Sequence, residues 1–190
     1  MAPGPQILSR ERIFEGRKVS LEVHHVRDTA GRETTREVVR HGGSVGILAF
    51  PEPGVLLLER IWRYAVGAAM LEIPAGTLEP GEDPAACAAR ELAEETGYRA
   101  GRLRPLLAIH PSPGILSERL TIYLASDLAK GEPRREAGEE IESLLVPVDE
   151  ALAMIHDGRI TDSKTVAAVL YWDARRRDAA DAPRHAEGGA

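Results

Sequence analysis

The chain has 190 residues, of which 43% are hydrophobic, and it carries a formal net charge of −6 at pH 7. This length is enough for one domain with a sizeable core, and the negative charge argues against a nucleic-acid partner. The one cysteine, Cys87, excludes an intrachain disulfide. Because no apolar run is long enough to span a membrane and the first residues lack a signal-peptide pattern, we expect a cytoplasmic protein with no membrane partner.

The N-terminal part of the chain has little apolar content. Residues 1–9 predict a flexible N-terminus. Residues 18–27 and 33–40 favour two strands around the turn Asp28-Thr-Ala-Gly31, with few apolar side chains on either strand. We therefore interpret residues 10–40 as an antiparallel hairpin that is exposed or covered by a partner.

The remainder of the chain alternates apolar strands with helices. Short runs rich in β-branched and aliphatic residues predict strands at 44–50, 55–61, 70–73, 103–109, 120–125 and 144–148. Amphipathic patterns predict helices at 149–156 and from Asp162 to about Arg175, and residues 177–190 predict a disordered tail. Strands on both sides of a central helix, with further helices at the end, favour a layered α/β (α+β) fold.

That central helix follows a glycine- and proline-rich loop. Asp83 is a good N-cap, Pro84 suits the first helical position, and Gly97 suits a left-handed stop, so the helix is expected over residues 84–96. Helical spacing assigns one stripe of side chains to the core. Its members are Ala85, Ala89, Leu92 and Thr96.

Another face of this helix is acidic. Glu91 and Glu95 are one turn apart, Glu94 lies beside them, and Arg90 is spaced to pair with Glu94. Two carboxylates about 5.5 Å apart repel by roughly 3 kcal/mol at an effective dielectric near 20, and a cation between them reverses the sign. Carboxylate oxygens suit Mg²⁺ or Mn²⁺. By themselves, three glutamates are more typical of a solvated helix face.

The flanking residues distinguish the two interpretations. Residues 76–98 fit the Nudix box, Gly-x5-Glu-x7-Arg-Glu-U-x-Glu-Glu-x-Gly-U with U apolar. The fixed positions are Gly76, Glu82, Arg90, Glu91, Leu92, Glu94, Glu95, Gly97 and, loosely, Tyr98. The chain therefore resembles a Nudix hydrolase. The resemblance implies a Nudix-type α/β/α sandwich with a mixed central sheet over residues 41–176, and the N-terminal hairpin lies outside it.

The resemblance also implies the metal site. Glu91 and Glu95 would be the main ligands, Glu94 would assist them, and the carbonyl of Ala75 would add a further oxygen. Glu82 and Arg90 would brace the loop against the helix instead of binding metal. Two or three Mg²⁺ ions, or Mn²⁺, are expected in each site.

A second motif points to one branch of the family. Ser112-Pro113-Gly114 lies fifteen residues beyond Tyr98, which resembles the ADP-ribose pyrophosphatases. The likeness implies that Pro113 and Gly114 shape the substrate pocket and that Glu118 contacts substrate or metal; otherwise the segment is a stiff connection.

The same branch implies further substrate and catalytic residues. Arg63 and Glu72, nine residues apart, would contact substrate, and Arg40 is a weaker phosphate candidate. Glu139, with Glu140 second, would activate water from a loop before the last strand, and Glu95 would share in catalysis.

We therefore expect hydrolysis of ADP-ribose to AMP and ribose 5-phosphate. One alternative is another nucleoside diphosphate derivative: a nucleotide sugar, a dinucleotide or an oxidised nucleotide. The other is a non-catalytic module that senses ADP-ribose, although such modules usually lose the carboxylates that are all present here. The branch further implies a homodimer formed through residues 10–40, in which the N-terminal strands contribute to the partner's site.

Overall fold

The structure is a computed structural model that describes residues 4–135 and 140–181. Its helices and strands follow the order of the predicted ones, with an added strand at the N-terminal end, another before the central helix, and a longer last helix. In chain order they are β1 (Gln6–Glu15), β2 (Val19–Arg27), β3 (Glu33–His41), β4 (Ser44–Ala49), β5 (Val55–Arg63), β6 (Ala68–Glu72), β7 (Ala75–Thr77), α1 (Pro84–Thr96), β8 (Arg99–Ile109), β9 (Leu120–Ala129), β10 (Ile141–Pro147), α2 (Val148–His156) and α3 (Ser163–Asp181).

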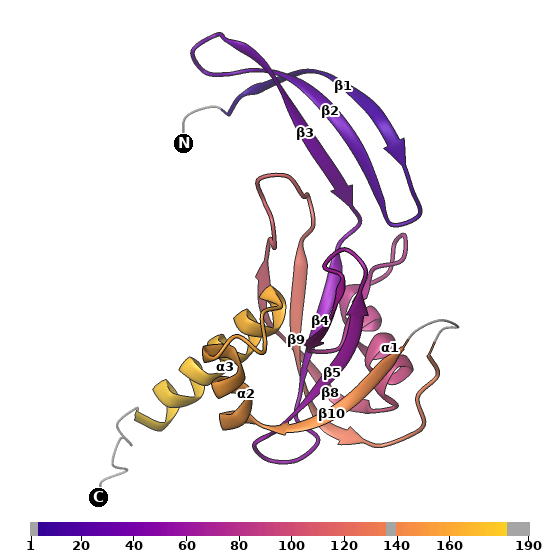
Figure 1. The fold of residues 1–190 in the computed structure, drawn as a ribbon, viewed down its shortest axis with the longest axis vertical. Helices are drawn as coiled ribbons and strands as arrows, with labels where there is room; N and C mark the ends of the chain where they lie inside the picture. Colours follow the sequence, from indigo (N-terminus) through magenta and orange to yellow (C-terminus); the bar gives the residue numbers. More distant parts are fainter. Residues whose placement is uncertain (1–3, 136–139, 182–190) are drawn as a thin grey trace, which may run out of the picture.

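The body of the molecule has helices on both sides of its strands (Figure 1). One sheet has the order β7-β4-β9-β8, with β4 parallel to β9 and the other pairs antiparallel. A second, antiparallel sheet has the order β10-β5-β6. Helix α1 lies on one side of these strands, and α2 and α3 lie on the other. The predicted α/β/α sandwich with a mixed sheet is confirmed.

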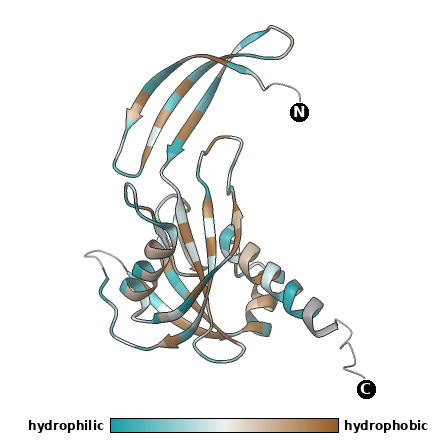
Figure 2. Cartoon of the chain, turned by 180° about the vertical axis from the view of Figure 1, so that it is seen from behind, coloured by the Kyte–Doolittle hydropathy of each residue, from teal (hydrophilic) through white to brown (hydrophobic). Residues whose placement is uncertain are grey.

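Strand β4 shows why the sheet needs helices on both sides. Every residue of β4 is buried, which is typical of a strand covered on both faces. Val45 and Ile47 pack in the cluster that contains Leu92 of α1, whereas Leu48 packs in the cluster that contains Val169 of α3. Apolar strands run through the middle of the body in Figure 2. Truncating a buried leucine such as Leu92 to alanine costs about 2–5 kcal/mol in stability.

The caps of α1 are the predicted ones. The Asp83 side chain accepts hydrogen bonds from the backbone N–H groups of Ala85 and Ala86 at 2.9 and 3.0 Å. Gly97 ends the helix in the left-handed region with φ of 80°. The predicted core stripe is only partly right, because Ala89 is exposed. The residues that α1 buries are Cys87, Ala88, Leu92, Glu95 and Thr96.

The N-terminal region is a three-stranded antiparallel sheet that extends away from the body (Figures 1 and 2). The predicted hairpin is β2 and β3, and β1 adds a third strand that includes residues 6–9, where a flexible end was expected. Every residue of β1 is exposed, so its sequence shows no buried face, and its backbone pairing with β2 defines it. At the other end of the chain, α3 continues to Asp181 and takes in the first residues of the expected tail.

Hydrogen bonds cap the start of helix α3 and attach it to the strands of the body. Asp162 caps it by accepting hydrogen bonds from the backbone N–H of Thr165 at 3.0 Å and from the Thr165 hydroxyl at 2.6 Å. The same hydroxyl accepts a hydrogen bond from the backbone N–H of Ile73, which ties α3 to the strand region at 2.8 Å. None of the helices among the described residues is long and apolar enough to cross a membrane.

Candidate active site

A cavity of about 870 Å³ is bounded by β5, the loop before α1, α1 itself, the start of α3 and the turn between β1 and β2. It brings together residues that are far apart in the sequence and that were predicted as site residues. Those that line it are Arg63, Ala75, Glu91, Glu94, Glu95 and Glu118. The cavity also collects residues that the sequence did not single out, among them Arg17, Lys18 and Lys164.

Arg90 organises the acidic face of α1. Its guanidinium donates to both carboxylate oxygens of Glu82, at 2.9 and 3.0 Å, and also to Glu91 at 2.8 Å and Glu94 at 3.2 Å. These hydrogen bonds lower the pKa of Glu82 to about 2, and the hydrogen bond to Glu82 raises the pKa of Arg90. The expected brace between the loop and the helix is confirmed, and the same guanidinium balances the charge of Glu91 and Glu94.

The backbone of β7 lies directly against the Glu91 side chain. A Cβ atom at Gly76 would be 2.0 Å from Cδ of Glu91, which is far inside van der Waals contact. Glycine is therefore needed at this position because any side chain would occupy the space that the Glu91 carboxylate fills. This close approach sets the carboxylate beside the strand residues Ala75 and Gly76.

Glu95 is held from two sides. Its Oε2 accepts a hydrogen bond from the backbone N–H of Ala75 at 3.2 Å, and a hydrogen bond joins its carboxyl group to that of Glu59. Glu59 of β5 is 2% exposed, and its Oε1 has no hydrogen-bond partner among the described residues. Burial raises the pKa of Glu59 to about 7. A glutamate inside an apolar strand was the sequence signal for this residue, and it was not recognised.

The residues around α1 fit a divalent cation by their chemistry. Glu91, Glu94 and Glu95 supply carboxylate oxygens on the cavity wall, beside the Ala75 backbone. The Glu91 carboxylate lies against the backbone of Gly76 in β7, where a Cβ atom would be 2.1 Å from its Oε1. Hard cations such as Mg²⁺ prefer such oxygen ligands. Within residues 4–135 and 140–181, however, no three histidine, cysteine, aspartate or glutamate side chains are already grouped as a metal cage, and Arg90 lies between the carboxylates of Glu91 and Glu94.

The other end of the cavity contains an ion-pair network. Arg63 donates from Nε and Nη2 to the two oxygens of Glu72, at 2.9 and 2.7 Å. Lys164 Nζ donates to the same Glu72 carboxylate and lies 3.1 Å from Oδ2 of Asp162. Burial acts to raise the pKa of Glu72, but the hydrogen bond from Arg63 and the charge of Lys164 outweigh it, so this pKa is lowered.

This network separates the predicted roles of Arg63 and Glu72. Arg63 lines the cavity, but Glu72 is 2% exposed, is not among the described residues that line it, and has both oxygens bound by cations. Glu72 therefore orients Arg63 and Lys164. Lys164 was missed because a lysine in the first turn of a helix is usually a solvated side chain.

The remaining predicted substrate residues divide into two groups. Glu118 lines the cavity, where its carboxylate accepts a hydrogen bond from the Ser44 hydroxyl. Pro113, Gly114 and Arg40 are exposed and are not among the described residues that line the cavity. The loop that contains Pro113 is instead docked on β3, whose Val39 donates from its backbone N–H to the Ile115 carbonyl at 2.8 Å.

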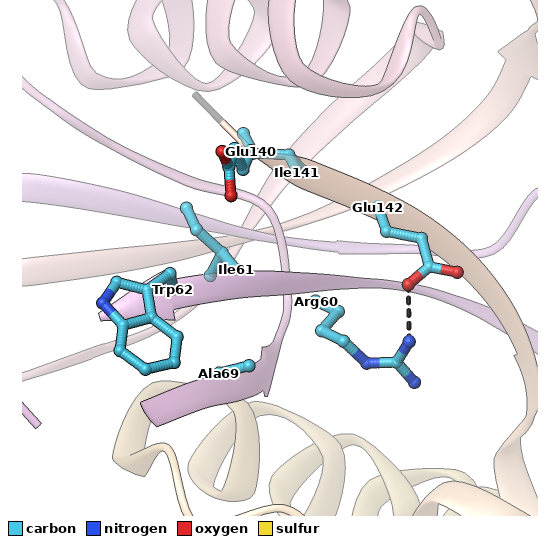
Figure 3. Close-up of a pocket in the computed structure, with 7 residues that line it drawn as sticks. All are labelled: Arg60, Ile61, Trp62, Ala69, Glu140, Ile141 and Glu142. Carbon is cyan, nitrogen blue, oxygen red and sulfur yellow. Dashed lines mark hydrogen bonds and ion pairs between the residues drawn. The ribbon is translucent and has the colours of Figure 1, made fainter. Parts of the chain in front are cut away.

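A second cavity, of about 460 Å³, adjoins the first at Ile61, which lines both (Figure 3). It is lined by Trp62 and Glu140, and an ion pair of 2.5 Å between Arg60 and Glu142 lies at its edge. Glu140, the second candidate for water activation, thus belongs to this neighbouring cavity. Glu139, the first candidate, lies outside the described residues.

The segment before Glu139 is fastened to the end of α1. Arg134 donates from its backbone N–H to the Glu94 carbonyl at 2.8 Å, and Arg135 donates from Nε to the Glu95 carbonyl at 2.9 Å. Gly97 lies so close that a Cβ atom there would be 2.5 Å from the Gly131 carbonyl oxygen. The base of this loop is therefore attached to the helix that carries the acidic residues.

Comparison with known proteins agrees with this geometry. A family profile of the NUDIX domain matches residues 40–169. The ADP-ribose pyrophosphatase of Bacillus subtilis is 36% identical over 166 residues, which cover 86% of this chain and 90% of that protein. The methanol dehydrogenase activator of Bacillus methanolicus is 39% identical over 166 residues, with the same coverage. A crystal structure of an ADP compounds hydrolase superposes with a TM-score of 0.82 at 21% identity, covering 93% of this chain and 96% of that one.

The layered fold and the acidic helix beside a cavity define a Nudix domain, and the chain belongs to the Nudix family. It is a Nudix pyrophosphohydrolase.

Proposed function

We propose that the protein hydrolyses the diphosphate bond of ADP-ribose, giving AMP and ribose 5-phosphate, with a divalent cation as cofactor. The observation that carries this proposal is the shared cavity, which Arg63, Glu91, Glu94, Glu95 and Glu118 all line. The similarity to the Bacillus subtilis ADP-ribose pyrophosphatase supports the choice of substrate.

In this proposal the residues of α1 hold the cation. Glu91 and Glu95 are the main ligands, Glu94 assists, and the Ala75 carbonyl adds one oxygen; Mg²⁺ or Mn²⁺, two or three per site, fits these oxygens. When bound, such an ion neutralises charge on the diphosphate and lowers the pKa of water. The hydrogen bond from the Ala75 N–H to Glu95 keeps the carboxylate near that carbonyl.

The rest of the cavity binds and orients the diphosphate. Arg63, fixed by Glu72, offers its remaining N–H groups to a phosphate, and Lys164 adds positive charge beside it. Glu118 faces the same space and would contact a ribose hydroxyl or an ion. We assign the orientation of the attacking water to Glu139, with Glu140 as the second candidate and Glu95 contributing from the helix.

A second candidate keeps the chemistry and changes the substrate. Pro113 and Gly114, the residues on which the ADP-ribose prediction depended, are exposed and outside the described cavity lining. A relative of similar identity is named for a different role, as a methanol dehydrogenase activator. Another nucleoside diphosphate derivative, such as a nucleotide sugar, dinucleotide or oxidised nucleotide, is therefore the alternative substrate class.

A sensor without catalysis is the remaining alternative. All the carboxylates of the box are present, which disfavours it. One experiment separates the three functions: phosphate release, with a phosphatase added, from a panel of nucleoside diphosphate derivatives. Preference for ADP-ribose supports the proposal, equal rates on many substrates favour a broad hydrolase, and tight ADP-ribose binding without turnover favours the sensor.

We also propose that the protein is a homodimer formed through the N-terminal sheet. Large apolar side chains on this sheet are exposed, including Ile13 and Phe14 at 51% and 56%. Strand β1 forms backbone pairs with β2 on one side, and among the described residues nothing pairs with its other edge. An open edge with exposed apolar side chains suits pairing with a second copy.

A further inference from the structure

The turn between β1 and β2 belongs to the N-terminal sheet but lies at the cavity of the body. A hydrogen bond from the Gly16 N–H to the Val19 carbonyl closes this turn at 2.9 Å. Its two basic residues, Arg17 and Lys18, line the cavity together with Leu78 to Pro80 of the loop before α1. Figure 1 shows the turn beside that loop. The N-terminal sheet therefore contributes side chains to the candidate active site.

These two side chains differ from the other cations of the cavity. Of the five basic residues among the described cavity lining, Arg63 pairs with Glu72, Arg90 pairs with three glutamates, and Lys164 pairs with Glu72 and Asp162. Arg17 and Lys18 make no ion pair or side-chain hydrogen bond with any residue that the structure describes. Their positive charge is thus the part of the cavity's cationic charge that is not paired with a carboxylate among the described residues.

An uncompensated pair of cations at the edge of a diphosphatase cavity suits one ligand chemistry. A guanidinium binds phosphate oxygens through two parallel hydrogen bonds, and an ammonium adds a compact charge. We propose that Arg17 and Lys18 bind a phosphate group of the nucleoside diphosphate substrate in the cavity of their own subunit. The identity of that substrate rests on the function proposed above. Because the contacts form in the bound ground state as well as in the transition state, their loss raises KM more than it lowers kcat.

The test is the double substitution Arg17→Ala/Lys18→Ala, with Arg10→Ala/Arg36→Ala as the matched control. The control removes the same charge from the same sheet, at exposed positions that do not line the cavity. We expect about a tenfold higher KM for ADP-ribose in the first variant, a kcat within about twofold of the parent, and a weaker dependence of KM on salt. An unchanged KM, or an equal rise in the control, overturns the proposal.

A binding measurement separates this proposal from the proposed function. Inorganic pyrophosphate with Mg²⁺ is titrated calorimetrically into the parent protein and both variants, and no turnover of ADP-ribose is needed. About tenfold weaker binding to Arg17→Ala/Lys18→Ala alone supports the phosphate contact even if ADP-ribose is not hydrolysed. Equal binding by all three proteins overturns the contact, whatever the substrate is.

Hybrid dimers test whether the contact is made within one subunit. Arg17→Ala/Lys18→Ala is co-expressed with Glu95→Gln under separate tags, and the hybrid is purified. If each turn serves its own cavity, the only active site in the hybrid keeps the raised KM. A hybrid with the parent KM means that the turn of the Glu95→Gln subunit serves its neighbour, which overturns the assignment to the same subunit.

Discussion

The body and the N-terminal sheet of this protein are both built from β-strands, but they differ in how far those strands are buried. In the body, β4 is buried along its whole length and packs against helices on both faces. In the N-terminal sheet, β1 is exposed along its whole length, and only His24 and Val26 are buried among the described side chains of all three strands. A sheet with so little buried apolar surface gains little stability from its own side chains.

The difference indicates where precision is required. In the body, burial and hydrogen bonds fix each acidic side chain, so small changes there should have large effects on catalysis or stability. The N-terminal sheet instead owes its position to its connection with the body and, as we propose, to a second copy of the chain. Changes there should act through assembly and substrate binding, with smaller effects. Four predictions follow this gradient from the body outward.

The largest effect is expected at the acidic helix. Glu95→Gln keeps the size of the side chain but removes a carboxylate that we assign to the divalent cation, so hydrolysis should fall by about a thousandfold or more. The circular dichroism spectrum and the elution volume should stay as in the parent. Glu150→Gln, at an exposed position on α2, is the control with the same change of charge. Parent-like turnover by Glu95→Gln would refute the metal assignment.

The next prediction concerns the pH dependence of stability. The pKa of Glu59 is raised by burial to about 7, from a usual value of 4.5. As the pH rises from about 4.5 to 7, the unfolded chain loses this proton before the folded protein does, so the free energy of unfolding should fall by up to about 3 kcal/mol. The glutamine of Glu59→Gln cannot ionise. The free energy of unfolding of this variant, minus that of the parent, should therefore increase as the pH rises from about 4.5 to 7.

Urea unfolding with EDTA present, at intervals from pH 4.5 to 8, measures this difference for Glu59→Gln. EDTA is needed because Glu59 is hydrogen-bonded to Glu95, which we assign to the divalent cation, so a bound cation would also change the pKa of Glu59. Glu142→Gln, which removes the same charge at an exposed position of β10, is the control. If the two free-energy curves of Glu59→Gln and the parent stayed parallel, the raised pKa would be wrong.

A smaller effect is expected at β7, the short strand that precedes the loop before α1. Gly76→Ala would bring a Cβ atom to 2.0 Å from Cδ of Glu91, so the flexible glutamate side chain must leave its position. We expect about a hundredfold lower kcat with little change in melting temperature, since a displacement of about 1 Å in a catalytic group can cost that much. Gly4→Ala, where no atom lies within 4 Å, is the matched control. A parent-like kcat would show that the position of Glu91 is not critical.

The smallest effect is expected in the N-terminal sheet. Ile13→Ser/Phe14→Ser removes two exposed apolar side chains of β1, so the protein should sediment as a monomer at micromolar concentration. Activity should fall only about tenfold, because the acidic helix is untouched. Val66→Ser removes a similarly exposed apolar residue from the body and should leave the oligomeric state unchanged. A parent protein that is already a monomer would exclude the proposed dimer.

The same contrast explains what the sequence could predict. The boundaries and caps of α1 were predicted closely because Asp83, Pro84 and Gly97 are local signals. The pairing of Arg90 with Glu94 was also predicted, since the two residues are one helical turn apart. The brace between Glu82 and Arg90 was implied by the family resemblance. Strand β1 was not predicted, because its residues are all exposed and the backbone pairing with β2 that defines it leaves no pattern in the sequence.

Long-range polar contacts were beyond the reach of local patterns. Lys164 reaches Glu72 across 92 residues, and nothing near either residue in the sequence indicates the other. Arg17 and Lys18 look like ordinary turn residues until the sheet is set against the body. Glu59 was visible as a lone carboxylate in an apolar strand, but its contact with Glu95 depends on how β5 packs beside α1.

The arrangement of Arg90 among Glu82, Glu91 and Glu94 has a consequence for how the protein survives ion starvation. If an acidic helix had no counterion of its own, its carboxylates would repel one another whenever divalent ions were removed, and this repulsion would favour unfolding of the helix. Here the Arg90 guanidinium neutralises part of the carboxylate charge even without divalent ions. Removal of divalent ions should therefore stop activity while the protein stays folded. Adding the ions back should restore activity without new protein synthesis.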